Sequence, residues 1–143
     1  MGPAEIATLI PHEGAMSLLA GIRAWDANAI RCIASSHRDA ANPLRRGGRL
    51  HAVCGVEYAS QAMAAHGRLS GGNGRRPRAG YLVSLRELVC RVPYLDDLAD
   101  DIAVAAEKLS GDELRVSYGF WLDCGGRELM RGRAAVLLDA DTP

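Results

Sequence analysis

The sequence has no excess of charge of either sign. Seventeen Lys and Arg balance seventeen Asp and Glu, which gives a formal net charge of +0. Binding to the phosphate backbone of nucleic acids needs a positive excess, so nucleic acid is not an expected partner. The composition is otherwise that of a folded chain, with 48% apolar and 24% charged residues. At this length we expect one domain that spans residues 1–143.

Long hydrophobic runs are also absent. No segment approaches the ~18 apolar residues that a membrane-spanning helix needs. The first residues, MGPAEIATLIPHEG, lack the basic start and the long apolar stretch of a signal peptide. We therefore expect a soluble, cytoplasmic protein without membrane contact.

Cysteine is scarce, and the motifs of common cofactor sites are missing. Cys32, Cys54, Cys90 and Cys124 form no CxxC pair and have no histidine nearby at zinc-ligand spacing. We expect reduced thiols and no metal site, with Cys32 and Cys90 as small buried apolar residues. The chain has no Walker loop, no GxGxxG between a strand and a helix, and no GxSxG elbow. No cofactor is expected.

One long helix stands out from a chain that otherwise favours strands. Residues 51–68 are rich in alanine, lack proline and reach Gly67, a typical helix stop. Apolar side chains lie all around this helix, so it should be enclosed by other structure. A β-hairpin is expected at 17–37, an ordered loop or flap at 39–49, an arginine-rich surface loop at 69–79, and antiparallel strands at 80–92, 101–110, 113–124 and 127–139.

Glu57 is the acidic side chain inside this apolar helix. A carboxylate there needs a partner or a raised pKa, which makes it a candidate for catalysis. Ser60 and Gln61 follow at i+3 and i+4, so they share its face and are able to line a site for substrate. The alternative is that this face simply contacts solvent or a subunit partner.

Four histidines are further candidates. His51 stands at the helix start, where free backbone amides polarise a bound carbonyl oxygen. His66 lies in the last helical turn, where a capping role is favoured over a chemical one. His12 and His37 occur in a turn and at a strand end, and structural roles are expected for both.

Three stretches together resemble the hotdog superfamily, in the branch of β-hydroxyacyl-(acyl carrier protein) dehydratases. The resemblance covers nearly the whole chain, and it is similar in particular to a divergent group linked to aryl-polyene-type lipid pathways. It implies an α+β hotdog fold, with a curved antiparallel sheet wrapped around one long central helix, and a dimer. The stretches are Ile10-Pro11-His12 through Met16-Ser17-Leu18-Leu19, Asn42-Pro43-Leu44 through the helical motif from Gly55 to His66, and the strand-rich end.

The resemblance also implies roles for individual residues. In such dehydratases a loop histidine removes the α-proton and a helix carboxylate helps expel the β-hydroxyl group; Glu57 matches the carboxylate. The histidine normally stands fourteen residues earlier, where this chain has Pro43. Proline has no titratable group, so His51 is the nearest replacement. The backbone N–H that holds the thioester oxygen is expected from Ala52.

Three functions are compatible with these residues. The leading hypothesis is a 3-hydroxyacyl-(acyl carrier protein) dehydratase that forms a trans-2-enoyl thioester, with Glu57 and His51 as catalytic residues and Ala52 and Gln61 as substrate-binding residues. A hotdog acyl thioesterase is the second, because such enzymes need no loop histidine. A non-catalytic acyl-binding or dimer-partner subunit is the third. The expected partners are an acyl carrier protein or a CoA thioester and a second chain, as a homodimer or a higher oligomer of dimers.

Overall fold

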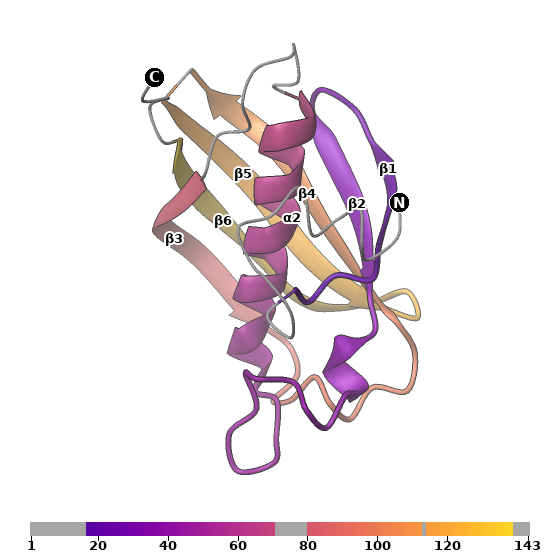
Figure 1. Ribbon diagram of the computed structural model, residues 1–143. Coiled ribbons are helices and arrows are strands. Elements are labelled where there is room, and N and C mark those ends of the chain that lie inside the picture. Colours follow the sequence, from indigo (N-terminus) through magenta and orange to yellow (C-terminus); the bar gives the residue numbers. More distant parts are fainter. Residues whose placement is uncertain (1–16, 71–79, 113, 139–143) are drawn as a thin grey trace.

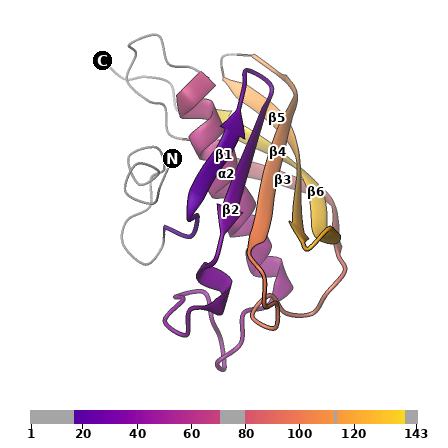
Figure 2. The same ribbon diagram turned by 90° about the vertical axis from the view of Figure 1, so that its right-hand side faces the viewer.

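The computed structural model describes residues 17–70, 80–112 and 114–138. These residues form a six-stranded antiparallel sheet with one long helix on one of its faces (Figures 1 and 2). The expected architecture of an antiparallel sheet around a single helix is therefore confirmed. The strands lie in the order β1-β2-β4-β5-β6-β3; they are β1 (Gly21–Trp25), β2 (Ala29–Ala34), β3 (Gly80–Cys90), β4 (Ile102–Gly111), β5 (Arg115–Cys124) and β6 (Arg127–Leu138).

The long helix is shifted relative to its predicted range. A short 3-10 helix, η3 (Ala52–Cys54), leads into α2 (Gly55–Ser70). The helix passes through Gly67 instead of ending there, because a hydrogen bond that holds the last turn outweighs the cost of a glycine in a helix, about 0.5–1 kcal/mol. Ser70 Oγ holds that turn by donating to His66 O at 2.7 Å.

The N-terminal hairpin forms as predicted. β1 pairs with β2 across a turn in which Asp26 Oδ1 accepts hydrogen bonds from the amides of Asn28 and Ala29, at 2.7 and 2.9 Å. These bonds, that from Asn28 foremost, lower the pKa of Asp26. A second 3-10 helix, η2 (Ser36–Arg38), follows β2 and begins the path to the loop before α2.

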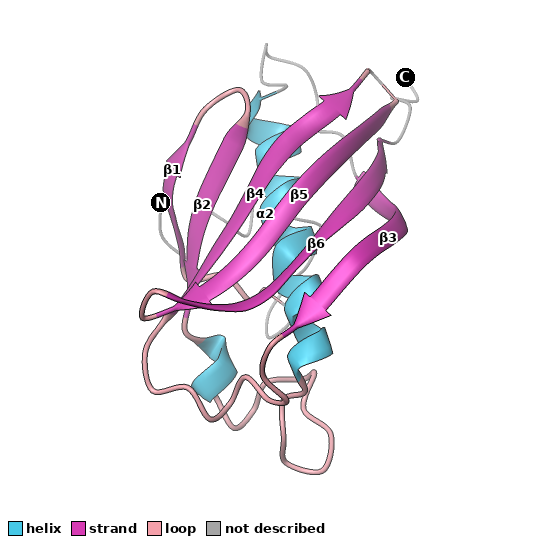
Figure 3. Ribbon diagram, turned by 180° about the vertical axis from the view of Figure 1, so that it is seen from behind, coloured by secondary structure: helices cyan, strands magenta, loops and turns pink. Residues whose placement is uncertain are grey.

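The two faces of the sheet differ. In β5 buried and more exposed residues alternate, and the buried ones, Val116, Tyr118, Phe120 and Leu122, belong to the core between the sheet and α2. We call this the inner face. The outer face carries the intervening side chains and is not covered by α2 (Figure 3).

Three details differ from the sequence-based expectations or lie outside the described residues. Cys90 is exposed, not buried, because it ends the edge strand β3. All four thiols are free. The predicted position of His12 and residues 71–79 of the arginine-rich loop fall outside the described ranges.

Candidate active site

Glu57 lies in the first turn of α2 and is half-buried. The positive end of the helix dipole at this terminus favours a negative charge there. The neighbouring residues that face the core, such as Tyr58 and Ala59, are fully buried. The carboxylate thus sits at the border between the apolar core and the surface.

The start of α2 is pressed against the sheet. A Cβ atom on Gly55 would lie 3.0 Å from Met130 Sδ and 3.1 Å from Leu122 Cδ2. Glycine at this position lets the helix backbone approach β5 and β6 closely. The close approach fixes where Glu57 stands relative to the sheet.

Gln61 lies one turn beyond Glu57 and is fully buried. Its Oε1 accepts a hydrogen bond of 2.8 Å from the backbone amide of Leu18. The side chain therefore joins α2 to the segment that precedes β1. Its predicted contact with substrate stays a prediction, and its carbonyl oxygen already has a donor within the chain.

His51 is the last residue of the loop before η3. It is exposed and forms an isolated β-bridge with Tyr94, and the two rings have centroids 5.1 Å apart. Arg49 Cζ lies 3.7 Å from the centroid of the Tyr94 ring. Within the described residues, the ring contact of His51 is with Tyr94, so the structure assembles His51 and Tyr94 rather than a pair of His51 and Glu57.

The amide predicted to hold the thioester oxygen is already engaged. Ala52 N donates to Pro93 O at 2.9 Å, and Cys54 N donates to His51 O at 3.0 Å. Between them, the Val53 amide has no acceptor among residues 17–70, 80–112 and 114–138. The Val53 side chain is 56% exposed. The open donor at this helix start is therefore one residue beyond the predicted one.

A buried polar cluster fixes the loop that contains Pro43. Asn42 Nδ2 donates to Tyr58 Oη at 3.1 Å and to Ser36 O at 3.0 Å, while its Oδ1 accepts from Leu44 N at 2.9 Å. Tyr58 Oη and Ser36 Oγ are 2.7 Å apart. Burial is the main cause that raises the pKa of Tyr58, so its hydroxyl stays protonated. The loop that contains Pro43 is thus joined through Asn42 to Tyr58, the residue after Glu57.

The sequence alone predicted no role for this cluster. The Asn-Pro dipeptide and the tyrosine after Glu57 were visible in the sequence as parts of the resembling motifs. A buried tyrosine hydroxyl and a buried asparagine each need hydrogen-bond partners, but their burial is known only from the structure.

Acidic side chains fix the loop that ends at His51. Asp96 accepts from Leu50 N at 2.8 Å and from Arg49 Nε at 2.9 Å. Burial acts to raise the pKa of Asp96, but the Leu50 amide and the Arg49 guanidinium together hold it below the usual value. Of the two predicted forms, ordered loop or flap, the structure shows an ordered loop.

The remaining histidines have structural partners. His66 was expected to cap the helix, but it is fully buried, with Nδ1 2.7 Å from Tyr118 Oη and Nε2 2.9 Å from Asp26 O. It joins α2 to β5 and to the hairpin turn. His37 is also fully buried and contacts Leu98 O through Nε2 at 3.1 Å, as expected of a structural histidine.

A metal site and a membrane-spanning helix are both absent from the described part of the chain. No group of three or more His, Cys, Asp or Glu residues there is arranged to hold a metal ion. None of the helices in the same ranges is long and apolar enough to cross a membrane.

Solved structures with the same fold include dehydratases and thioesterases. The dehydratase heterocomplex ApeI:P from Xenorhabdus doucetiae is 24% identical over 95% of this chain and 91% of that chain, with a TM-score of 0.84. A mutant thioesterase from Pseudomonas aeruginosa is 11% identical over 96% and 94% of the two chains, with a TM-score of 0.68. The E. coli PaaI protein from the phenylacetic acid degradation operon is 12% identical over 94% and 88%, with a TM-score of 0.64.

These likenesses establish the hotdog fold. A comparison with curated proteins found no match. The family model described as ApeP-like, ApeP dehydratase, matches residues 4–142, which is nearly the whole sequence. The chain therefore belongs to the ApeP-like family of dehydratases, hotdog proteins of the divergent kind that its sequence resembles.

Proposed function

We propose that this protein dehydrates a 3-hydroxyacyl thioester carried by an acyl carrier protein, with Glu57 as the central catalytic residue. The observation that carries the proposal is a half-buried carboxylate in the first turn of a helix whose neighbouring side chains are apolar and buried. A carboxylate in such a setting is suited to exchange a proton with a bound hydroxyl group.

The reaction involves two proton transfers and releases one water molecule. A base removes the proton from the α-carbon, the Cα–Cβ double bond forms, and the C–O bond to the β-hydroxyl breaks. Glu57 donates the proton with which this hydroxyl leaves as water. The product is the trans-2-enoyl thioester, and the thioester bond stays intact.

Backbone amides at the helix start support the developing charge. Negative charge grows on the thioester oxygen when the α-proton leaves, and a preorganised N–H stabilises it. We assign this role to Val53, whose amide is open, instead of Ala52, whose amide bonds to Pro93. His51 is the base in this proposal; it reaches Glu57 of a second chain rather than that of its own.

A second chain is part of the proposal because β3 ends the sheet with exposed apolar side chains. Leu82, Val83 and Leu85 are 41%, 47% and 39% exposed. An unpaired edge of this kind is a place where a strand of another chain adds. We propose a homodimer joined at β3, and Val83→Lys should shift the protein toward monomer in sedimentation velocity while its far-UV circular dichroism spectrum stays that of the wild type.

A second candidate function is a non-catalytic subunit. Pro43 stands where the base is expected, and the buried cluster around Asn42 holds it in place. The similar ApeI:P structure is a dehydratase heterocomplex, which supports a role for this chain together with a different partner chain.

Intact-mass analysis of a 3-hydroxyacyl carrier protein incubated with the purified protein distinguishes these functions. Loss of water supports the dehydratase, loss of the acyl group supports a thioesterase, and no change supports the non-catalytic subunit.

Glu57→Gln should lower turnover by about 10²-fold or more, because it removes the titratable proton while keeping the shape. His51→Ala should be comparably impaired, and the two effects should be far from additive. Glu107→Gln, the same change at an exposed glutamate of β4, serves as the matched control.

A further inference from the structure

The outer face of the sheet holds a cleft that is separate from the proposed site on α2. It has a volume of about 270 Å³ and lies over β3, β6, β5 and the end of β4, on the face seen in Figure 3. No aspartate or glutamate is among the described residues that line it. Its polar side chains are three arginines and three serines: Arg86, Arg115, Arg133, Ser84, Ser110 and Ser117.

The strand register places the serines in one row across the sheet. Ala135 of β6 is paired with Ser84 of β3 on one side and with Ser117 of β5 on the other. Ser117 is in turn paired with Ser110 of β4. Directly opposite residues point to the same face. The row therefore forms a floor of small side chains on which hydroxyl groups are exposed toward the cleft.

The arginines stand around this floor. Arg86 is directly opposite Arg133, two residues along from the serine row, and Arg115 lies two residues from Ser117 in the other direction. Like charges directly opposite each other in a sheet destabilise it. In the described ranges, Arg86 and Arg115 have no ion-pair partner, so the cleft retains positive charge that nothing in those ranges neutralises.

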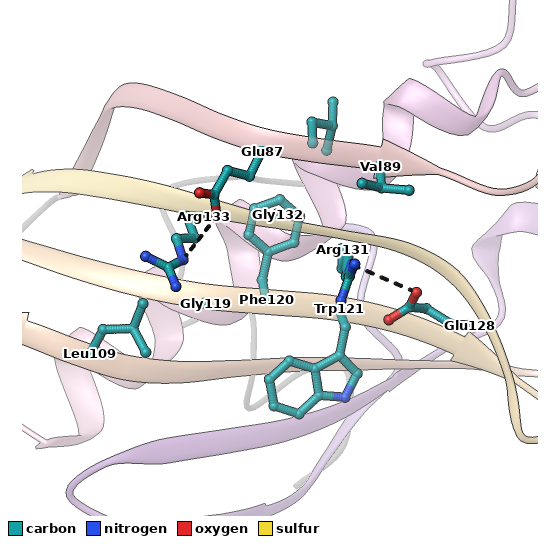
Figure 4. Close-up of a pocket in the computed structure, with 11 residues that line it drawn as sticks. Glu87, Val89, Leu109, Gly119, Phe120, Trp121, Glu128, Arg131, Gly132 and Arg133 are labelled. Atoms are coloured by element: carbon teal, nitrogen blue, oxygen red, sulfur yellow. Dashed lines mark ion pairs between the residues drawn. The ribbon is translucent and has the colours of Figure 1, made fainter.

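The neighbouring cleft on the same face does not have this character. It is larger, about 610 Å³, and shares Leu109 and Arg133 with the first. Its arginines are matched by acids: Arg133 Nε is 3.1 Å from Glu87 Oε2, and Arg131 Nε is 4.0 Å from Glu128 Oε2 (Figure 4). The larger cleft thus contains acids beside its arginines, although Glu128 also pairs with Arg91, whereas no described acid lines the cleft with the serine floor.

We propose that the cleft formed by Arg86, Arg115, Arg133 and the serine row binds the phosphate group of a small phosphorylated ligand. Guanidinium groups form paired, charge-assisted hydrogen bonds with phosphate oxygens, and serine hydroxyls donate to the remaining ones. The volume accommodates a phosphate group with part of the molecule that carries it. This site is independent of Glu57 and of the proposed dehydration.

Glu87 competes with the ligand for Arg133. It is the one described non-glycine residue with a positive φ, 54°, and it lies in the irregular part of β3 between Arg86 and Val89. Its carboxylate points toward Arg133 (Figure 4). Removing the carboxylate should therefore strengthen phosphate binding, whereas removing an arginine should weaken it.

Titration with inorganic phosphate and pyrophosphate, followed by calorimetry and by amide shifts in NMR spectra, tests the proposal. We expect pyrophosphate to bind and to shift the amides of Ser84 and Ser117. Arg86→Ala and Arg133→Ala should each weaken binding by about tenfold, the loss expected for one charge-assisted contact. Arg23→Ala, which removes an exposed arginine from the far edge of the sheet, should leave it unchanged.

Glu87→Gln should tighten binding by up to about fivefold, the strength of a surface ion pair. Asp101→Asn, which removes an exposed acid from another part of the surface, is its control. The proposal is overturned if pyrophosphate does not bind at millimolar concentration, or if Arg23→Ala weakens its binding as much as Arg86→Ala does. Amide shifts confined to residues other than those of the cleft would overturn it as well. Co-sedimentation with phosphatidylglycerol vesicles that depends on Arg86, without binding of soluble pyrophosphate, would also overturn it in favour of a lipid surface.

Discussion

The stability of the protein should fall when the pH is lowered from about 7.5 to about 5.5, because two buried histidines resist protonation in the folded state. Burial is the main cause that lowers the pKa of His66 and of His37 from the usual 6.5. Asp26 O accepts a hydrogen bond from His66 Nε2. A neutral ring therefore carries its proton on Nε2 and accepts from Tyr118 Oη at Nδ1.

The sign and size of the effect follow from proton linkage. The unfolded chain binds a proton at each of these histidines as the pH falls through 6.5, while the folded chain binds it only at lower pH. The contribution of these histidines to stability is thus fully present above pH 6.5, their pKa in the unfolded chain, and is lost as the pH falls below it. For a ring that stays neutral in the folded state, the loss over this interval is about 1.4 kcal/mol, so the two rings together account for at most about 2.7 kcal/mol.

Urea unfolding at a series of pH values measures this loss. His66→Gln should destabilise the protein at every pH and remove about half of the pH dependence. His51→Gln, which replaces an exposed histidine, should leave the dependence as in the wild type. A wild type whose free energy of unfolding is flat over this interval, or a His66→Gln variant with the full dependence, would refute the reasoning.

Three further substitutions test the packing. Gly132→Ala should destabilise by about 1–3 kcal/mol in urea unfolding, because the added Cβ would lie 2.8 Å from Cζ of the buried Phe120; unchanged stability would show that the ring moves freely. Gly67→Ala should instead stabilise by about 0.5–1 kcal/mol, since its Cβ meets nothing within 4 Å in a helix, and a loss would contradict the open surroundings described. Tyr58→Phe should cost about 1–3 kcal/mol, because it leaves a buried donor of Asn42 without its acceptor; differential scanning calorimetry would reveal a smaller cost if water replaced the hydroxyl.

The sequence predicted the elements well because their signals are local. The alternation of apolar and polar residues in β5 reflects a strand that is buried on one face. The alanine-rich segment before Gly67 reflects a helix that is buried on most of its sides. The helix end was missed by a few residues because a glycine stops a helix only when nothing else holds the last turn. Here a bond from Ser70 to His66 O does so.

The candidate site was harder to predict because its hydrogen bonds join distant segments. That Ala52 donates to Pro93 depends on a loop some forty residues later, and no local pattern indicates it. The same holds for His66, whose partners lie in the hairpin and in β5. A helix-terminal histidine is expected to be a cap until those elements are known to pack on it.

The contacts of His66 also bear on the order in which the chain folds. Its ring joins residues that lie 40 and 52 positions away in sequence, so both loops must close before either hydrogen bond forms. Contacts of such long range are slow to form and come late unless a nucleus contains them. We therefore expect His66→Gln to accelerate unfolding in stopped-flow experiments while the refolding rate changes little. The hairpin turn would then be the part of the native protein that detaches first.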